Sequence, residues 1–327
     1  MATPTAVTGE RPPVSIITGY LGSGKTTLLN RLLRDPGMAR AAVIINEFGE
    51  TGLDHLLVAT PSENTVLLAN GCLCCTIRGE LATAIKDLHS KRERGTVPAF
   101  RRLVVESTGL ADPFPILSTV QADPVLRHHF RLGTVVTTVD AVNGIGRPES
   151  RKQVAVADRL VLTKTDLAPD AAALVAALRR LNPDAPLWRS ADEPIEAREL
   201  LGDVVRSPLR ALPARSESPH GAVHAFALAF DGALDWTMFG VWLTMLLNRH
   251  GEKVLRVKGI LNVAGSATPV AVHGVQHLVH PPEHMAAWPD EDRQSRLVFV
   301  VDGLERAAIE RSLHAFLRAP PRLAAVA

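Results

Sequence analysis

The sequence has almost no excess of charge of either sign. Its 327 residues include 36 Lys and Arg against 34 Asp and Glu, which leaves a formal net charge of +2 at pH 7. Proteins that bind nucleic acids or membrane surfaces electrostatically usually carry a clear excess of basic residues. The balanced charge therefore argues against both of these partner classes.

Long hydrophobic runs are missing as well. No apolar stretch approaches the ~20 residues that a membrane-spanning helix needs, and residues 1–13 lack the apolar core of a signal peptide. Hydrophobic residues still make up 46% of the chain and charged residues 21%, which excludes a disordered or fibrous protein. We expect a soluble, cytoplasmic protein, and its length suggests two domains.

Cysteine is scarce, and all 3 cysteines lie within four positions, at Cys72, Cys74 and Cys75. An odd number of cysteines this close together cannot form a disulfide framework. Three thiolates in one loop can give Zn²⁺ or a similar ion two or three sulfur ligands. Tetrahedral zinc needs a fourth ligand, for which Glu47, a C-terminal histidine, water or a partner protein are candidates. The alternatives are buried thiols that only pack in the core, and redox chemistry.

The first two-thirds of the chain alternates β-branched runs with helical patterns. The expected strands are residues 14–18, 42–46, 65–68, 103–106, 134–139, 159–163 and 186–188. The expected helices between them include residues 25–34, 80–94 and 170–181. This alternation predicts βαβ units, and hence an α/β fold with a mostly parallel sheet covered by helices on both faces.

The composition of the sequence changes at residues 207–221, SPLRALPARSESPHG, which contain three prolines and show no hydrophobic periodicity. Such a segment is typical of an exposed linker. The patterns beyond it predict strands at 223–230, 254–263, 269–279 and 296–301 and helices at 236–249 and 304–318. We therefore predict a first domain at 1–206, a linker at 207–221, and a smaller α+β domain at 222–327 with an antiparallel sheet.

A glycine-rich loop joins the first expected strand to the first expected helix. Residues 19–26, GYLGSGKT, match the phosphate-loop pattern of Gly, four residues and Gly-Lys-Ser/Thr in the required context. The residues whose backbone would surround a phosphate at the helix N-terminus are Gly19, Gly22, Ser23 and Gly24. Lys25 would reach the β- and γ-phosphates, and the Thr26 hydroxyl would bind Mg²⁺. The loop predicts a nucleoside triphosphate site.

Residues 163–166, TKTD, end a later strand, where P-loop GTPases read the base. The Asp166 carboxylate can accept hydrogen bonds from N1–H and the 2-amino group of guanine, which adenine does not offer, and the stem of Lys164 can lie along the base. GTPases usually carry Asn where this chain has Thr163, which leaves open how the loop is supported. The alternative is an ordinary Lys/Asp pair at a strand end.

An acidic residue, Glu106, ends the apolar run 103–105 and precedes Ser-Thr-Gly. An acid at the end of a buried strand beside the phosphate loop suits Mg²⁺ or its bound water, with Gly109 near the γ-phosphate.

Four histidines, at positions 273, 277, 280 and 284, fall within twelve positions of the C-terminal domain. In an extended strand His273 and His277 point to one face and could bind metal. Surface histidines on a sheet are the slightly favoured alternative.

Together these motifs resemble the CobW family of metal-handling P-loop GTPases. The resemblance rests on residues 19–26, NEFGE at 46–50, GCLCC at 71–75, ESTGLADP at 106–113 and TKTD at 163–166, with RVKGIL at 256–261 and SRLVF at 295–299 in the C-terminal domain. It implies that GTP hydrolysis is coupled to delivery of a divalent metal, commonly Zn²⁺ or Co²⁺, to a client metalloprotein. The alternatives are a non-enzymatic metal store or sensor, and a thiol redox switch under ATP control.

The resemblance also implies roles for individual residues. The metal-binding cysteines correspond to Cys72, Cys74 and Cys75. The nucleotide-binding residues correspond to Gly22, Ser23, Gly24, Lys25, Thr26, Thr27, Lys164 and Asp166. Glu47 is expected near both the metal and the γ-phosphate, and acts with Lys25 and Glu106 in the catalytic set. Whether the chain also forms a homodimer stays open.

Overall fold

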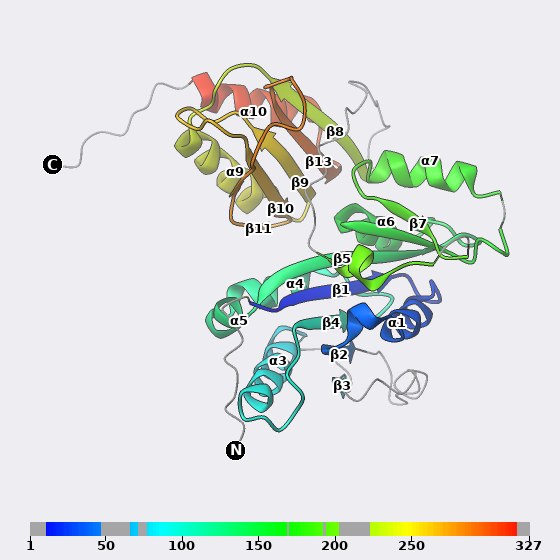
Figure 1. The fold of residues 1–327 in the computed structure, drawn as a ribbon. Helices are drawn as coiled ribbons and strands as arrows, with labels where there is room; N and C mark the ends of the chain where they lie inside the picture. The colour runs from blue at the N-terminus through cyan, green and yellow to red at the C-terminus, as the bar shows by residue number, and fades with distance from the viewer. Residues whose placement is uncertain are drawn as a thin grey trace. The chain divides into compact units, whose positions relative to one another are not determined.

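The computed structural model describes residues 11–46, 66–70, 77–168, 170–191, 194–202 and 223–318. It divides the chain into two compact units, residues 1–171 with 185–205, and residues 172–184 with 206–327. Helix α7 (Ala172–Leu181) thus belongs with the second unit, whereas the sequence analysis placed this segment in the first domain. An ion pair of 2.9 Å between Lys258 and Asp184, just after α7, accompanies this grouping. Figure 1 shows both units.

A seven-stranded sheet forms the centre of the first unit. Its strands are β1 (Pro13–Gly19), β2 (Ala41–Asn46), β3 (Val66–Asn70), β4 (Arg102–Glu106), β5 (Arg131–Asp140), β6 (Arg159–Thr163) and β7 (Leu187–Arg189). They are arranged in the order β3-β2-β4-β1-β5-β6-β7, and every neighbouring pair is parallel. The carboxyl ends of parallel strands meet at one edge of a sheet, and the predicted nucleotide motifs follow β1, β4 and β6 at this edge.

Helices cover both faces of this sheet. They are α1 (Lys25–Leu33), α3 (Ile77–Glu93), α4 (Phe114–Ala122), α5 (Pro124–His129), α6 (Pro148–Val156) and α8 (Ala197–Leu201), with a 3-10 turn at Pro36–Met38. The leucines of α1 and α8 share a buried core with Val136 of β5. The next residue, Thr137, points to the other face, where its hydroxyl donates to the carbonyl of Gln153 in α6.

The second unit is built on an antiparallel sheet. Its strands are β8 (Val223–Phe230), β9 (Val254–Leu261), β10 (Val270–Val275), β11 (Leu278–Val279), β12 (Glu283–His284) and β13 (Ser295–Asp302), and the order is β11-β10-β9-β13-β8 with β12 beside β10. Helices α9 (Trp236–His250) and α10 (Arg306–Arg318) pack on one face, where Trp242, Phe299 and Leu313 are among the buried core residues. The predicted α/β unit followed by a smaller α+β unit is confirmed.

The structure corrects one predicted element. Residues 269–279 do not form one strand, because the chain turns at Gln276, which has a φ of 49°. The turn separates β10 from β11, which pair as a hairpin. His273 therefore does not share a strand face with His277 and instead stacks on His280, with ring centres 4.4 Å apart.

Among the described residues, no helix is both long and apolar enough to cross a bilayer.

Candidate functional site

The phosphate loop connects β1 directly to α1. Gly22 and Gly24 have φ values of 70° and 87°, in the left-handed region that favours glycine. Gly24 is the N-cap of α1 and provides no side-chain cap, so the first backbone N–H groups of the helix stay open for a ligand. The Nζ atom of Lys25 folds back over the loop and donates to the carbonyl oxygens of Gly19 and Tyr20 at 3.0 and 3.2 Å. The glycine turn between strand and helix and the open helix N-terminus are the features that the sequence motif predicts, whereas Lys25 contacts its own loop.

The acid after β4 lies beside the first turn of α1. The Thr26 hydroxyl donates to Oε1 of Glu106 at 2.8 Å, and Glu106 is only 3% exposed. Hydroxyl and carboxylate oxygens are the ligands that Mg²⁺ prefers. The two predicted Mg²⁺ residues are thus brought together, and their donor atoms fit this ion.

Thr163, at the end of β6, supports the phosphate loop from the other side. Its hydroxyl donates to the carbonyl oxygen of Ser23 at 2.8 Å, and the carbonyl oxygen of Val139 lies 3.2 Å from it as a weaker second acceptor. A Cβ placed on Gly24 would come within 3.4 Å of the Thr163 methyl carbon, so the loop and the strand end are closely packed. A threonine hydroxyl therefore connects the loop that is predicted to read the base with the phosphate loop.

Five buried hydroxyl side chains form a continuous chain below the site, which we call the hydroxyl chain: Ser107, Thr18, Thr138, Ser23 and Thr163. Ser107 donates to the Thr18 hydroxyl at 2.8 Å, and Thr138 donates to the Thr18 carbonyl at 3.2 Å. Because the single proton of Thr138 is used there, Ser23 is the donor in the 2.7 Å hydrogen bond between these two hydroxyls. The hydroxyl chain connects the loops after β4, β1 and β6.

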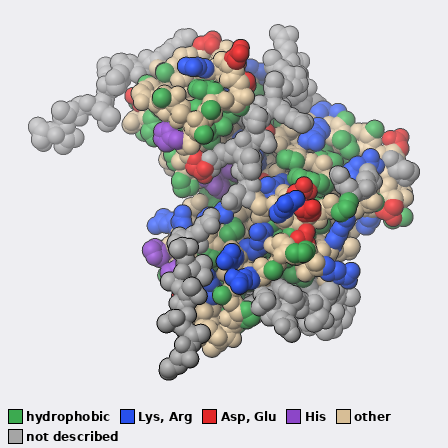
Figure 2. All heavy atoms as spheres, viewed as in Figure 1, with side chains coloured by type: hydrophobic (Ala, Val, Ile, Leu, Met, Phe, Trp, Pro, Cys, Tyr) green, Lys and Arg blue, Asp and Glu red, His purple; other side chains and the backbone are tan. Residues whose placement is uncertain are grey.

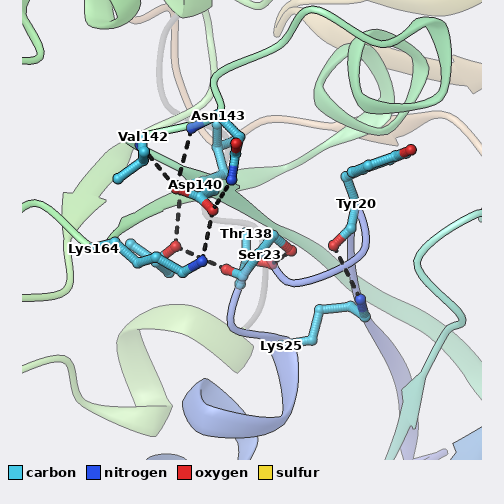
Figure 3. A network of polar contacts seen from close by, with 10 residues as sticks. Tyr20, Ser23, Lys25, Thr138, Asp140, Val142, Asn143 and Lys164 are labelled. Atoms are coloured by element: carbon cyan, nitrogen blue, oxygen red, sulfur yellow. Dashed lines mark hydrogen bonds and ion pairs between the residues drawn. The ribbon is translucent and has the colours of Figure 1, made fainter. Parts of the chain in front are cut away.

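Asp140, at the end of β5, is an acid that the sequence analysis missed. Figure 3 shows Lys164, Asn143 and Val142 converging on its carboxylate. Lys164 Nζ and Asn143 Nδ2 both lie 2.7 Å from Oδ2, and the Val142 N–H donates to Oδ1 at 2.8 Å. Burial opposes ionisation most strongly, but these hydrogen bonds outweigh it, so the pKa of Asp140 lies below its usual value of 3.8. The side chain fixes where the Lys164 ammonium lies.

The predicted base-reading carboxylate, Asp166, is exposed beyond this cluster. It follows Lys164, whose φ of 57° turns the backbone, and the Leu167 N–H closes the turn on the Lys164 carbonyl at 3.1 Å. Asp166 accepts no hydrogen bond from the described residues, so its oxygens are available to a base. Thr27, also predicted to line the nucleotide, is exposed in the first turn of α1.

The loop after β4 rests on the phosphate loop. A Cβ placed on Gly109 would lie 2.6 Å from the backbone nitrogen of Leu21, so only glycine permits this approach. Gly109 is thereby next to the phosphate loop, as expected for a residue near the γ-phosphate.

The predicted metal ligands Glu47, Cys72, Cys74 and Cys75 lie outside the described residues. In the part of the chain that the structure describes, no group of three or more His, Cys, Asp or Glu side chains could hold a metal ion, and this covers the C-terminal histidines.

Two family descriptions match the chain. The nucleotide-binding domain of CobW/HypB/UreG matches residues 13–189, and the C-terminal domain of the cobalamin synthesis protein CobW matches residues 223–317.

Individual proteins match over most of their length. The zinc chaperone YjiA of Escherichia coli (strain K12) is 33% identical over 297 residues, which cover 88% of this chain and 93% of that protein. The zinc chaperone CobW of Pseudomonas aeruginosa is 29% identical and covers 93% of this chain and 91% of its own length. The crystal structure of the Zn(II)-bound YjiA GTPase superposes with a TM-score of 0.73 at 29% identity, over 95% of this chain and 100% of that chain.

Proposed function

Because the chain belongs to the CobW/HypB/UreG family, we propose that it is a GTP-hydrolysing metallochaperone that delivers Zn²⁺ to a client metalloprotein. One observation carries the nucleotide part of this proposal. The phosphate loop is held between two motif loops, with Thr26 bonded to Glu106 on one side and Ser23 bonded to Thr163 on the other. A glycine turn that merely resembled the motif would not bring these three motifs to one sheet edge.

The chain's own residues would divide the work of GTP hydrolysis. Lys25 would leave the loop carbonyls to neutralise the β- and γ-phosphates, and the open N-terminus of α1 would donate to the phosphate oxygens. Mg²⁺, held by Thr26 and Glu106, would supply the positive charge that stabilises the developing negative charge on the phosphates. Asp166 would select guanine while the stem of Lys164, anchored on Asp140, lies along the base.

Zn²⁺ is the cargo in this proposal. YjiA and CobW are named zinc chaperones. A related protein from Schizosaccharomyces pombe is named a zinc-regulated GTPase metalloprotein activator, and it is 37% identical to this chain over 166 residues. Cys72, Cys74 and Cys75 are the soft ligands that this chain offers, and Glu47 is the candidate that would connect them to the nucleotide. Co²⁺ is the alternative cargo, and the client is an apo-metalloprotein.

Phosphate release measured with GTP and with ATP, each with and without Zn²⁺, tests the enzymatic part. We expect turnover of GTP, little turnover of ATP, and a rate that depends on Zn²⁺. Turnover of neither nucleotide would favour a metal store or sensor, and a preference for ATP would favour the redox switch.

A Zn²⁺ titration against a chromogenic chelator tests the coupling between the two sites. The Zn²⁺ affinity should differ between the GDP state and a non-hydrolysable GTP state, by the ~5- to 150-fold that is typical of coupled sites. A Cys74→Ser, Cys75→Ser double variant is the control, because it removes two ligands and should lose both Zn²⁺ binding and the effect of Zn²⁺ on GTP affinity. Equal Zn²⁺ affinities in the two nucleotide states would contradict the chaperone cycle.

A further inference from the structure

Gln153, in the middle of α6, lies buried beneath the loop of residues 107–112, and only 1% of its surface is exposed. Its Nε2 atom donates to the carbonyl oxygens of Gly109 and Ala111, both at 3.1 Å. Because both neighbours are acceptors, only the NH₂ end of the amide can face them. The Oε1 atom therefore points elsewhere, and it has no hydrogen-bond partner in the described part of the chain.

A buried Oε1 atom without a partner is not expected of a side chain that only fills space in the core. A buried acceptor without a donor destabilises the folded state, and an apolar side chain of similar size at position 153 would avoid that cost. The benefit must then come from what the NH₂ end holds, which is the backbone of the loop after β4.

Holding a carbonyl group also orients the neighbouring N–H group. In a trans peptide the C=O and N–H groups point in opposite directions, and the described residues contain no cis peptide bond. The Gly109 carbonyl faces α6, so the N–H of Leu110 points away from α6. Neither the Gly109 nor the Leu110 N–H donates a hydrogen bond to another described residue. These two donors lie in the loop that rests on Leu21 of the phosphate loop.

We propose that Gln153 is a positioning residue for GTP hydrolysis, which holds the loop of residues 107–112 so that its free N–H groups face the γ-phosphate. This inference rests on the proposed function, because it requires GTP at the phosphate loop. Gln153 contacts no phosphate itself and acts through Gly109 and Ala111. Since GDP has no γ-phosphate, the contact favours binding of GTP and not of GDP.

The Gln153→Met variant tests this inference in the full-length protein, because methionine keeps the length of the side chain and removes its donors. The dissociation constants of GDP and of a non-hydrolysable GTP analogue are measured, together with kcat. Two lost hydrogen bonds should weaken binding of the analogue by about 5- to 30-fold and lower kcat, while the affinity for GDP changes by less than about twofold. Gln121→Met in α4 is the matched control, because Gln121 is partly exposed and forms no hydrogen bond with this loop.

The Gln153→Glu variant adds a readout that a packing role would not change. An ionised glutamate offers only acceptors to the two carbonyl oxygens, whereas a protonated one offers an O–H donor. Burial favours the protonated form. In this variant the ratio of the affinity for the analogue to the affinity for GDP should therefore be lower than in the unmodified protein at about pH 8, and should recover partly at about pH 6. The ratio of the unmodified protein should stay level over this range.

The outcomes of these measurements distinguish the role of Gln153 from the proposed function. An unchanged affinity ratio in Gln153→Met, with an active unmodified protein, would overturn the role of Gln153 and leave the proposed function intact. Equal losses for GDP and for the analogue would also overturn it, because they would show that Gln153 only stabilises the fold. An unmodified protein that neither binds nor hydrolyses GTP would overturn the proposed function and this inference with it.

Discussion

Replacing Thr163 by Val removes one hydroxyl from the nucleotide site and leaves the shape of the side chain nearly unchanged. The hydroxyl is buried, with 6% of the residue exposed, and lies 2.8 Å from the Ser23 carbonyl and 3.2 Å from the Val139 carbonyl. A hydrogen bond of this kind contributes about 0.5–1.5 kcal/mol, and a buried acceptor left without a donor costs about 1–3 kcal/mol. The Val139 carbonyl lies in the β5–β6 pairing region, so the larger loss falls on Ser23 in the phosphate loop.

We therefore expect Thr163→Val to lower the free energy of unfolding by about 1–2 kcal/mol and to weaken binding of GDP by about 5- to 10-fold. Urea unfolding measures the first effect, and the dissociation rate of a fluorescent GDP measures the second. Thr163→Ser is the matched control, because it keeps the hydroxyl and should retain most of the nucleotide affinity. If Thr163→Val binds GDP as tightly as the unmodified protein, the hydroxyl does not support the phosphate loop and the argument fails.

Three further predictions concern single charged side chains of the site. Lys25→Ala should abolish tight GTP binding and turnover while leaving the fold intact, because Lys25 donates to carbonyl oxygens of the phosphate loop and the apolar core lies elsewhere; a wild-type rate of phosphate release would contradict the phosphate-loop assignment. Asp166→Asn should reduce the preference for GTP over ATP, measured as the ratio of the two dissociation constants, and equal affinities in the unmodified protein would already refute this role. Since the pKa of Asp140 is lowered from 3.8, its ionised form stabilises the folded state above this pH, and that stabilisation is lost as the pH falls through the lower folded pKa. The unfolding free energy of Asp140→Asn should therefore fall less steeply than that of the unmodified protein as the pH is lowered. Parallel curves of unfolding free energy against pH for the two proteins would disprove this prediction.

The parts of the site that sequence could predict are those written in neighbouring residues. The glycines and Lys25 of the phosphate loop stand in one segment of eight residues, and Glu106 ends an apolar run that identifies a buried strand. Asp140 ends the run 134–139 in the same way, so the signal that identified Glu106 could also have identified it.

The supporting residues could not be predicted in this way, because their partners are distant in the sequence. Thr163 bonds a carbonyl 140 positions away, and Gln153 bonds carbonyls 44 and 42 positions away. These contacts exist only once β1, β4 and β6 lie in one sheet with α6 on its face. Neither residue type in isolation distinguishes a supporting role from an ordinary buried polar side chain.

The errors and omissions in secondary structure have equally local causes. The turn at Gln276 breaks the predicted strand 269–279 although its sequence, VQHL at 275–278, contains no Gly, Pro, Asn or Asp that would indicate a turn. Helix α4 was not predicted because its sequence, FPILSTVQA, is apolar nearly all round and shows no helical periodicity.

The hydroxyl chain affects how this site binds a nucleotide. Its members come from three strands and two loops. The hydroxyl groups of Ser107, Thr138, Ser23 and Thr163 each donate to a named partner, and that of Thr18 accepts from Ser107. Ser107 anchors the loop expected at the γ-phosphate and Thr163 anchors the loop expected at the base, so the two ends of the site are set at a fixed spacing by the buried hydrogen bonds between them. A preformed site binds its ligand with less loss of conformational entropy than one that must order its loops. The nucleotide would therefore act on groups outside the hydroxyl chain. These are the Lys25 ammonium, which would exchange carbonyl oxygens for phosphate, and the N–H groups of Gly109 and Leu110. A response to the γ-phosphate must accordingly start from these groups. The hydrogen bonds from Gln153 to the carbonyl oxygens of Gly109 and Ala111 therefore matter more for the GTP state than for the GDP state.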